Sequence, residues 1–160
     1  NAKIGKFKSS DYSQLAYDTS IISILPYDTT LWQVSGGKQG ELLNEDFRII
    51  DSLFISGINS NNLKREESLK KRGITDTIFK SQVIIDLKRY KYYRQYISII
   101  NKQGEKIVFI NCFCGGWNEQ LELNWRKRLI QVEDGGSCYF HLFINLTTKV
   151  INQFSVNDLG

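Results

Sequence analysis

Three cysteines and one histidine are the residues of this sequence whose types and spacing could support chemistry. Cys112 and Cys114 are two positions apart, so both thiols would lie on one face of a strand. An imidazole beside either thiol would lower its pKa and produce a reactive thiolate, and His141 is the only imidazole in the chain. A cysteine-dependent enzyme that pairs Cys112 or Cys114 with His141 is one alternative. A single histidine on a strand is more often a partly buried structural residue.

The same side chains make a poor metal site. Zinc usually takes four protein ligands when it is structural, and Cys138 would point to the face opposite His141 on their shared strand. Three cysteines are an odd number, which leaves at least one thiol and permits one disulfide. We predict no metal and no cofactor, and we expect the cysteines to pack as small apolar side chains.

A basic and aromatic stretch, residues 88–94 (KRYKYYR), is the second candidate for chemistry. Cations interleaved with aromatic rings can contact phosphates and stack on bases. The net charge of +4 and the pI near 8.9 favour an anionic partner, but they fall short of dedicated nucleic-acid binders. A nucleic-acid-binding module is therefore a further alternative. We favour tyrosines that cover a sheet edge while the cations stay in water.

Two tryptophans mark the place where we expect a binding surface. Trp117 and Trp125 flank a polar stretch after a Gly-Gly pair, and each is tethered to the end of a neighbouring predicted strand. With Arg126 or Arg128 as an anion-binding group, they would combine aromatic walls with few polar anchors. The candidate ligand-binding residues are Trp117, Trp125, Arg126 and Arg128. The competing interpretation is that both indoles seal the open end of the core.

The elements that must position these residues lie between Tyr93 and Val156, where short alternating apolar segments are typical of an antiparallel sheet. The predicted strands are residues 93–100, 106–114, 128–133, 137–145 and 150–156. Asp134-Gly135 is expected to close a tight hairpin, because this pair accepts positive φ at low cost. Both faces of the central strands carry bulky residues, so both faces should be covered.

One principal helix is predicted over residues 41–58, with Gly57 at its exit. Its apolar stripe consists of Leu43, Phe47, Ile50 and Phe54, widened by Ile49 and Leu53. Residues 59–73 have few apolar contacts and should form an exposed helix or a mobile excursion. Residues 74–87 are expected to form a connecting segment that contains a short strand at 83–85.

Length and composition are those of one domain, residues 1–160, which can bury a core without the help of disulfides or metal ions. A short strand is expected at 21–25, ended by Pro26. The apolar runs are too short to cross a bilayer, so no transmembrane segment is predicted. The chain begins at Asn1 and contains no methionine, which suits a processed product or a trimmed fragment. No export leader is present to be read.

Short segments between residues 95 and 157 resemble a group of small uncharacterised bacterial proteins. They are QYI (95–97), GEK (104–106), INCFC (110–114), DGGSCYF (134–140) and INL (144–146). Those proteins often carry export or lipoprotein signals. The resemblance therefore implies an extracytoplasmic location, periplasmic or lipoprotein-anchored, and it assigns no catalytic residue.

A long helix before an antiparallel meander also resembles the cystatin and nuclear-transport-factor-2-like superfamilies, in which a curved sheet wraps the helix. The predicted fold is α+β, with one main helix packed on a curved antiparallel sheet of four to five strands. Such folds include inhibitors, small-molecule binders and a few enzymes. The leading prediction is a non-enzymatic binding or interaction module of an exported bacterial protein. Its partner would be a protein or a small molecule rather than nucleic acid.

Overall fold

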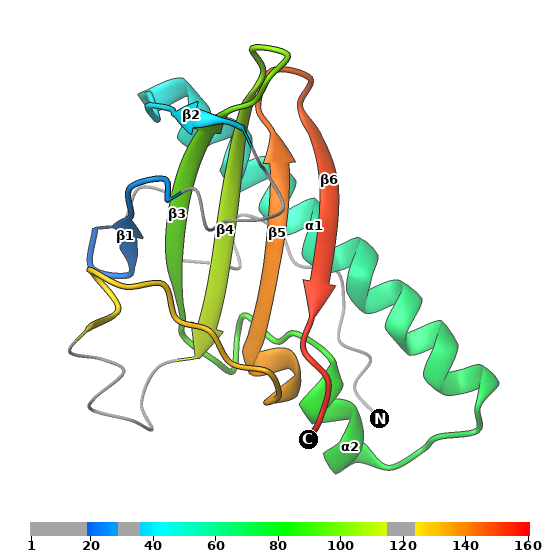
Figure 1. The fold of residues 1–160 in the computed structure, drawn as a ribbon. Helices are drawn as coiled ribbons and strands as arrows, with labels where there is room; N and C mark the ends of the chain where they lie inside the picture. Colours follow the sequence, from blue (N-terminus) through cyan, green and yellow to red (C-terminus); the bar gives the residue numbers. More distant parts are fainter. Residues whose placement is uncertain (1–18, 29–35, 115–123) are drawn as a thin grey trace.

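The computed structural model describes residues 19–28, 36–114 and 124–160 (Figure 1). Within these ranges the helical elements are α1 (Asn44–Lys71), α2 (Thr77–Val83) and a 3-10 turn, η3 (Gly136–Cys138). The strands are β1 (Ile22–Ile24), β2 (Lys38–Gln39), β3 (Tyr92–Ile100), β4 (Lys106–Cys114), β5 (Tyr139–Asn145) and β6 (Val150–Val156).

The sheet confirms the α+β class and its antiparallel core. Strands β3, β4, β5 and β6 form a meander, and each pairs antiparallel with the next. The sheet has six strands rather than four or five, because two short strands add to the outer edge of β3. Of these, β1 runs parallel to β3 and β2 runs antiparallel to it. The β5–β6 turn is fixed by Asn145, whose Oδ1 accepts hydrogen bonds from the backbone N–H groups of Thr147 and Thr148 at 3.0 Å each.

The predicted strand at 128–133 is wrong, and so is the hairpin that Asp134-Gly135 was expected to close. Residues 128–133 contain no strand, and Gly135, at φ +94°, instead precedes η3. The backbone of this segment bonds to side chains rather than to a neighbouring strand. Ile130, for example, donates its N–H to Gln95 Oε1 at 2.9 Å and accepts from Asn111 Nδ2 at 2.7 Å. Because these backbone groups already have hydrogen-bond partners, the segment need not pair with a neighbouring strand.

The principal helix is longer than predicted, because α1 continues through residues 59–71 to Lys71. Gly57 does not end it but lets it approach β6. A Cβ at this position would lie 2.7 Å from Ile151 Cδ1 and 3.2 Å from the Phe154 ring. The extension is held by Asn62, whose amide donates to the Ile85 carbonyl at 2.8 Å and accepts from the Ile85 N–H at 3.0 Å.

The strand expected at 83–85 is wrong, because a second helix, α2, occupies Thr77–Val83. Asp76 caps it by accepting a hydrogen bond from the Phe79 N–H at 2.8 Å. Val83 and Ile84 are buried against Leu69 near the end of α1. The apolar residues of this segment thus serve helix packing.

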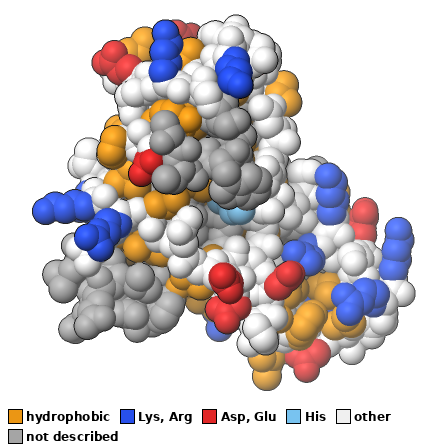
Figure 2. Space-filling model, in the orientation of Figure 1, with side chains coloured by type: hydrophobic (Ala, Val, Ile, Leu, Met, Phe, Trp, Pro, Cys, Tyr) orange, Lys and Arg blue, Asp and Glu red, His pale blue; other side chains and the backbone are white. Residues whose placement is uncertain are grey.

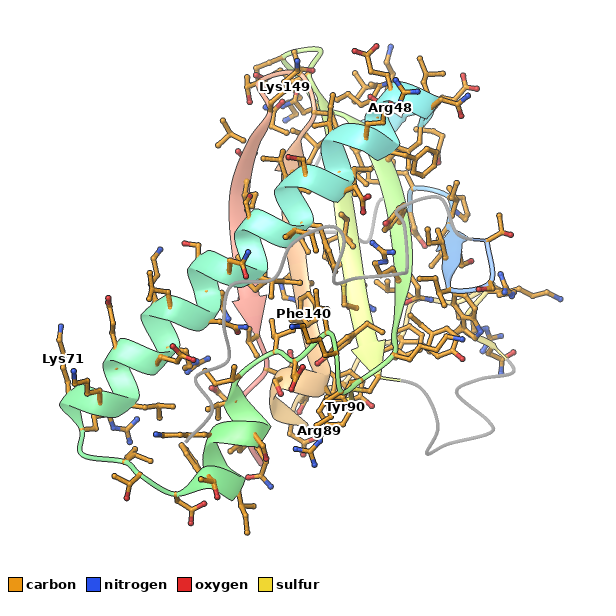
Figure 3. The ribbon with its side chains drawn as sticks, turned by 180° about the vertical axis from the view of Figure 1, so that it is seen from behind. Arg48, Lys71, Arg89, Tyr90, Phe140 and Lys149 are labelled. Carbon is orange, nitrogen blue, oxygen red and sulfur yellow. A yellow bond between two sulfur atoms is a disulfide. The ribbon has the colours of Figure 1, made fainter. Side chains whose placement is uncertain are left out.

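Both faces of the sheet are covered, as expected. The first face packs against α1, where the Phe54 and Phe140 rings lie 6.0 Å apart (Figure 3). The second face, toward the viewer in Figure 1, carries two smaller apolar clusters. In Figure 3 the end of α1 at Lys71 projects past the sheet. The described part of the chain contains no helix that is both long and apolar enough to cross a membrane.

Candidate binding site on the sheet face opposite α1

The suggested thiol–imidazole pair does not form. Cys112 lies in the core beneath α1, whereas His141 contacts Phe109 on the opposite face of the sheet. The strand register explains this, since His141 pairs with Asn111 and so shares its face rather than that of Cys112. Burial raises the pKa of the Cys112 thiol far above its usual value, against a smaller lowering by Arg94. Cys112 is therefore a neutral, fully buried core residue.

The other two cysteines form a disulfide. Cys114 at the end of β4 is bonded to Cys138 in η3, with the Cα atoms 5.1 Å apart. The bond joins the end of one strand to the turn that leads into the next one. Cys112 is the remaining free thiol. Of the described residues, no group of three or more His, Cys, Asp or Glu side chains is arranged to hold a metal ion.

The basic and aromatic stretch divides between core and solvent. Tyr92 is buried and donates its hydroxyl to the Ser137 carbonyl at 2.8 Å, and Tyr93 stacks on Phe113 at 5.7 Å. Arg94 is fully buried with its guanidinium 4.8 Å from the Phe54 ring. The remaining cations of the stretch are exposed. The nucleic-acid alternative stays a prediction that now depends on Lys88, Arg89 and Lys91.

The four candidate ligand-binding residues have different environments. Trp117 lies outside the described residues. Trp125 is only 5% exposed and packs on Tyr93 and Phe113. The guanidinium of Arg126 stacks 4.3 Å from the Trp125 ring and donates to the carbonyls of Ile22 and Thr19, at 3.2 and 3.1 Å. Arg126 therefore fastens the chain next to β1.

A row of polar side chains crosses the sheet on the face against which Trp125 packs. Gln95 pairs with Asn111, Asn111 with His141, and His141 with Ser155, so that β3, β4, β5 and β6 each contribute one polar residue to the same face. The next row toward the β3–β4 turn is apolar and includes Ile97, Phe109 and Phe143. We refer to Gln95, Asn111, His141 and Ser155 as the polar row.

The first two members of the polar row hold a segment that crosses this face, residues 124–134, which we call the crossing segment. Gln95, fully buried, donates through Nε2 to the carbonyls of Trp125 and of Arg128, the latter at 2.7 Å. Asn111 donates both to Gln95 Oε1 at 3.0 Å and to the Ile130 carbonyl at 2.7 Å. Figure 1 shows the crossing segment in yellow and orange in front of the strands. Arg128 contributes its backbone here, and its side chain is exposed.

A second anchor fixes the far end of the crossing segment. Asn157, just after β6, donates through Nδ2 to the carbonyls of Val132 and Asp134, the latter at 3.1 Å. Between the two anchors, residues 129–133 form one side of a cavity of about 770 Å³. Its floor contains Phe109, Asn111 and His141, and Leu25 lines its other side. Figure 2 shows this face, with the histidine side chain visible in a recess.

His141 is the unsatisfied member of the polar row. Its ring centroid lies 5.6 Å from that of Phe109 and 6.4 Å from that of Phe143. Its buried Nε2 makes no hydrogen bond with any described residue. Burial lowers the pKa of His141 below its ordinary value of 6.5, so the imidazole is neutral at neutral pH. A neutral imidazole carries one donor and one acceptor.

Comparison with protein-family models, with curated proteins and with solved structures finds no match for this chain.

Proposed function

We propose that this protein is a non-enzymatic binding module and that the cavity over His141 is its ligand site. The observation that carries the proposal is the polar row: its first two members hold the crossing segment, and its third, His141, lines a cavity with no hydrogen bond from Nε2 to any described residue. Buried polar groups normally have hydrogen-bond partners, so an exception in a side chain that lines a cavity marks a candidate ligand contact.

The dimensions and lining of the cavity support a small-molecule ligand. A volume of about 770 Å³ lies within the roughly 300–1,000 Å³ typical of ligand pockets. Apolar side chains such as Leu25 and Phe109 would supply contact area, and Asn111 and His141 would supply orientation. The proposed ligand site is therefore not at the Trp117 and Trp125 end of the sheet, which is the location that the sequence analysis predicted.

An extracytoplasmic location and a cystatin-like or nuclear-transport-factor-2-like fold complete the proposal. The Cys114–Cys138 disulfide supports the location, because structural disulfides persist in oxidising compartments. Packing of α1 across the antiparallel meander supports the fold assignment. Both features suit an exported bacterial binding protein.

Binding can be tested with the uncharged fluorophore N-phenyl-1-naphthylamine. We expect the protein to enhance its emission with saturation at one site per chain. The variant Leu129→Trp should abolish most of this binding, because Leu129 is half-buried on the cavity wall and an indole there would fill the space. Leu63→Trp, at an exposed position of α1, is the matched control and should bind as the parent does.

Circular dichroism and the melting temperature must show that both variants are folded. Equal binding by the Leu129→Trp variant and the parent would show that the fluorophore sits elsewhere, and the proposed site would be wrong. Absence of any saturable binding by the folded parent would also contradict it.

A further inference from the structure

We propose that the cavity selects an uncharged ligand with a flat apolar body and one hydroxyl or amide group that hydrogen-bonds to His141. This inference rests on the proposed function and goes further by naming the chemical class of the ligand. It follows from the aromatic floor, from the unused polar atoms and from the distribution of charge around them.

The apolar part of the site is built around the aromatic ring of Phe109. Phe109 and Phe143 lie on adjacent strands with their ring centroids 4.8 Å apart, and Phe109 faces the cavity. Leu25 and Ile97, both buried, extend the same apolar region toward β1. Rings of this kind pack best against a planar partner, in offset-stacked or edge-to-face geometry.

Asn111 and His141 are the polar side chains that the neighbouring strands β4 and β5 contribute to the cavity floor. Asn111 donates hydrogen bonds through Nδ2 to Gln95 and to the Ile130 carbonyl. No described residue donates a hydrogen bond to its Oδ1. The Nε2 atom of His141 makes no hydrogen bond with the described residues, and His141 pairs with Asn111 on the neighbouring strand. Together they offer one amide acceptor and a neutral imidazole. A single ligand hydroxyl or amide can satisfy both, because it donates and accepts at once.

The charges around His141 give no preference for an anionic ligand. On its own strand, the nearest titratable group is Tyr139, whose pKa is raised to about 12 by burial and by Asp134, so it is uncharged. The residues facing it from β4 and β6 are neutral. The charged residues on the cavity rim are exposed and of both signs: Asp28, Lys127 and Glu133. A carboxylate on the floor would lose its hydration without gaining a cationic partner.

Three probes that share one ring system test this inference: naphthalene, 2-naphthol and 2-naphthoate, titrated at pH 7.5 into the folded protein. We expect 2-naphthol to bind about three- to tenfold more tightly than naphthalene, the gain from one net hydrogen bond, and 2-naphthoate to bind most weakly. His141→Phe keeps an aromatic ring and removes the nitrogens, so it should make 2-naphthol and naphthalene bind equally. Ser155→Ala, in the polar row but outside the cavity lining, should retain the preference.

The possible results separate this inference from the proposed function. If naphthalene or 2-naphthoate binds as tightly as 2-naphthol, the cavity is a ligand site but the assigned ligand class is wrong. A preference for 2-naphthol that survives in His141→Phe would also overturn the role of His141. If none of the three probes binds to the folded protein, the proposed function itself fails.

Discussion

At the scale of single residues, Gln95 determines how the crossing segment lies on the sheet. Its one amide bonds to Asn111 and to three backbone groups of the crossing segment, and the side chain has no exposed surface. A buried amide with all its groups paired is stabilising mainly because each partner would otherwise be left without a hydrogen bond. Gln95 therefore contributes to stability and holds Ile130, which lines the cavity.

Replacing Gln95 with leucine should lower the free energy of unfolding by about 3 kcal/mol, since two carbonyls and one N–H would lose their partner at about 1–3 kcal/mol each with partial relaxation. Urea denaturation monitored by circular dichroism measures the change. Gln153→Leu, at an exposed position on β6, is the matched control and should change stability by less than about 0.5 kcal/mol. A loss below about 1 kcal/mol for Gln95→Leu would show that the crossing segment is held by other contacts.

The burial of His141 predicts a dependence of stability on pH. Its pKa is lowered in the folded state by desolvation, so at mildly acidic pH the unfolded chain binds the proton more readily than the folded one. The free energy of unfolding should therefore be highest above the ordinary pKa of 6.5 and fall as the pH is lowered through it. Urea titrations at several pH values between 8 and 5 would reveal this component as a slope that His141→Phe lacks. An identical slope in that variant would assign the effect to other groups.

At the scale of elements, the sequence was informative wherever local pattern decides structure. The alternation in β3, β4, β5 and β6 predicted strands, and the bounds of 106–114 and 150–156 agree with those observed. The segment 128–133 has the same kind of pattern, but its backbone is satisfied by side chains of Gln95 and Asn111, which lie far away in sequence. The prediction that Gly57 ends the helix is wrong for a related reason. Its role is to permit close contact with β6, which is distant in sequence.

The candidate site was harder to predict than the fold. Trp125 and Arg126 are aromatic and basic as a binding site would be, yet they pack against the sheet and against the chain near β1. The polar row carries a sequence signal, namely polar residues at positions 95, 111 and 141 within strands that are otherwise mostly apolar. That signal has meaning only once the register is known, since the three residues become neighbours solely through strand pairing.

The extension of α1 is anchored by Asn62, which binds both backbone groups of Ile85. Asn62→Ala should lower the free energy of unfolding by roughly 2 kcal/mol, because the N–H and carbonyl of Ile85 would remain buried without partners. It should also speed amide hydrogen exchange in residues 62–71. Ser60→Ala, exposed on the same helix, is the control and should leave both quantities nearly unchanged. Unaltered exchange in Asn62→Ala would mean that the contacts of Leu69 suffice to hold this end.

At the scale of the whole molecule, the two faces of the sheet have different roles. The face beneath α1 holds the larger apolar core, including Phe54 and Phe140, and Cys112 is sealed within it. The opposite face carries smaller apolar clusters, the crossing segment and the cavity. The larger apolar core and the proposed binding site thus lie on opposite sides of the same four strands.

The state of the thiols can be read from the mass of the alkylated protein. When the chain is denatured without reductant and treated with iodoacetamide, we expect one label, on Cys112, and after reduction three. In the native protein Cys112 should resist labelling at neutral pH, because burial raises its pKa and excludes the reagent. Three labels without reduction, on protein isolated from an oxidising compartment, would contradict the Cys114–Cys138 bond.

The most direct test of the central claim is the nuclear magnetic resonance signal of the imidazole, because His141 is the only histidine in the chain and its ring resonances need no assignment. Titration with 2-naphthol should shift these resonances to saturation, with the same dissociation constant as that found by fluorescence or calorimetry. The shift should disappear in Leu129→Trp and persist in Leu63→Trp. Saturable binding of 2-naphthol that leaves the His141 resonances unmoved would contradict the claim that the ligand site lies over this histidine.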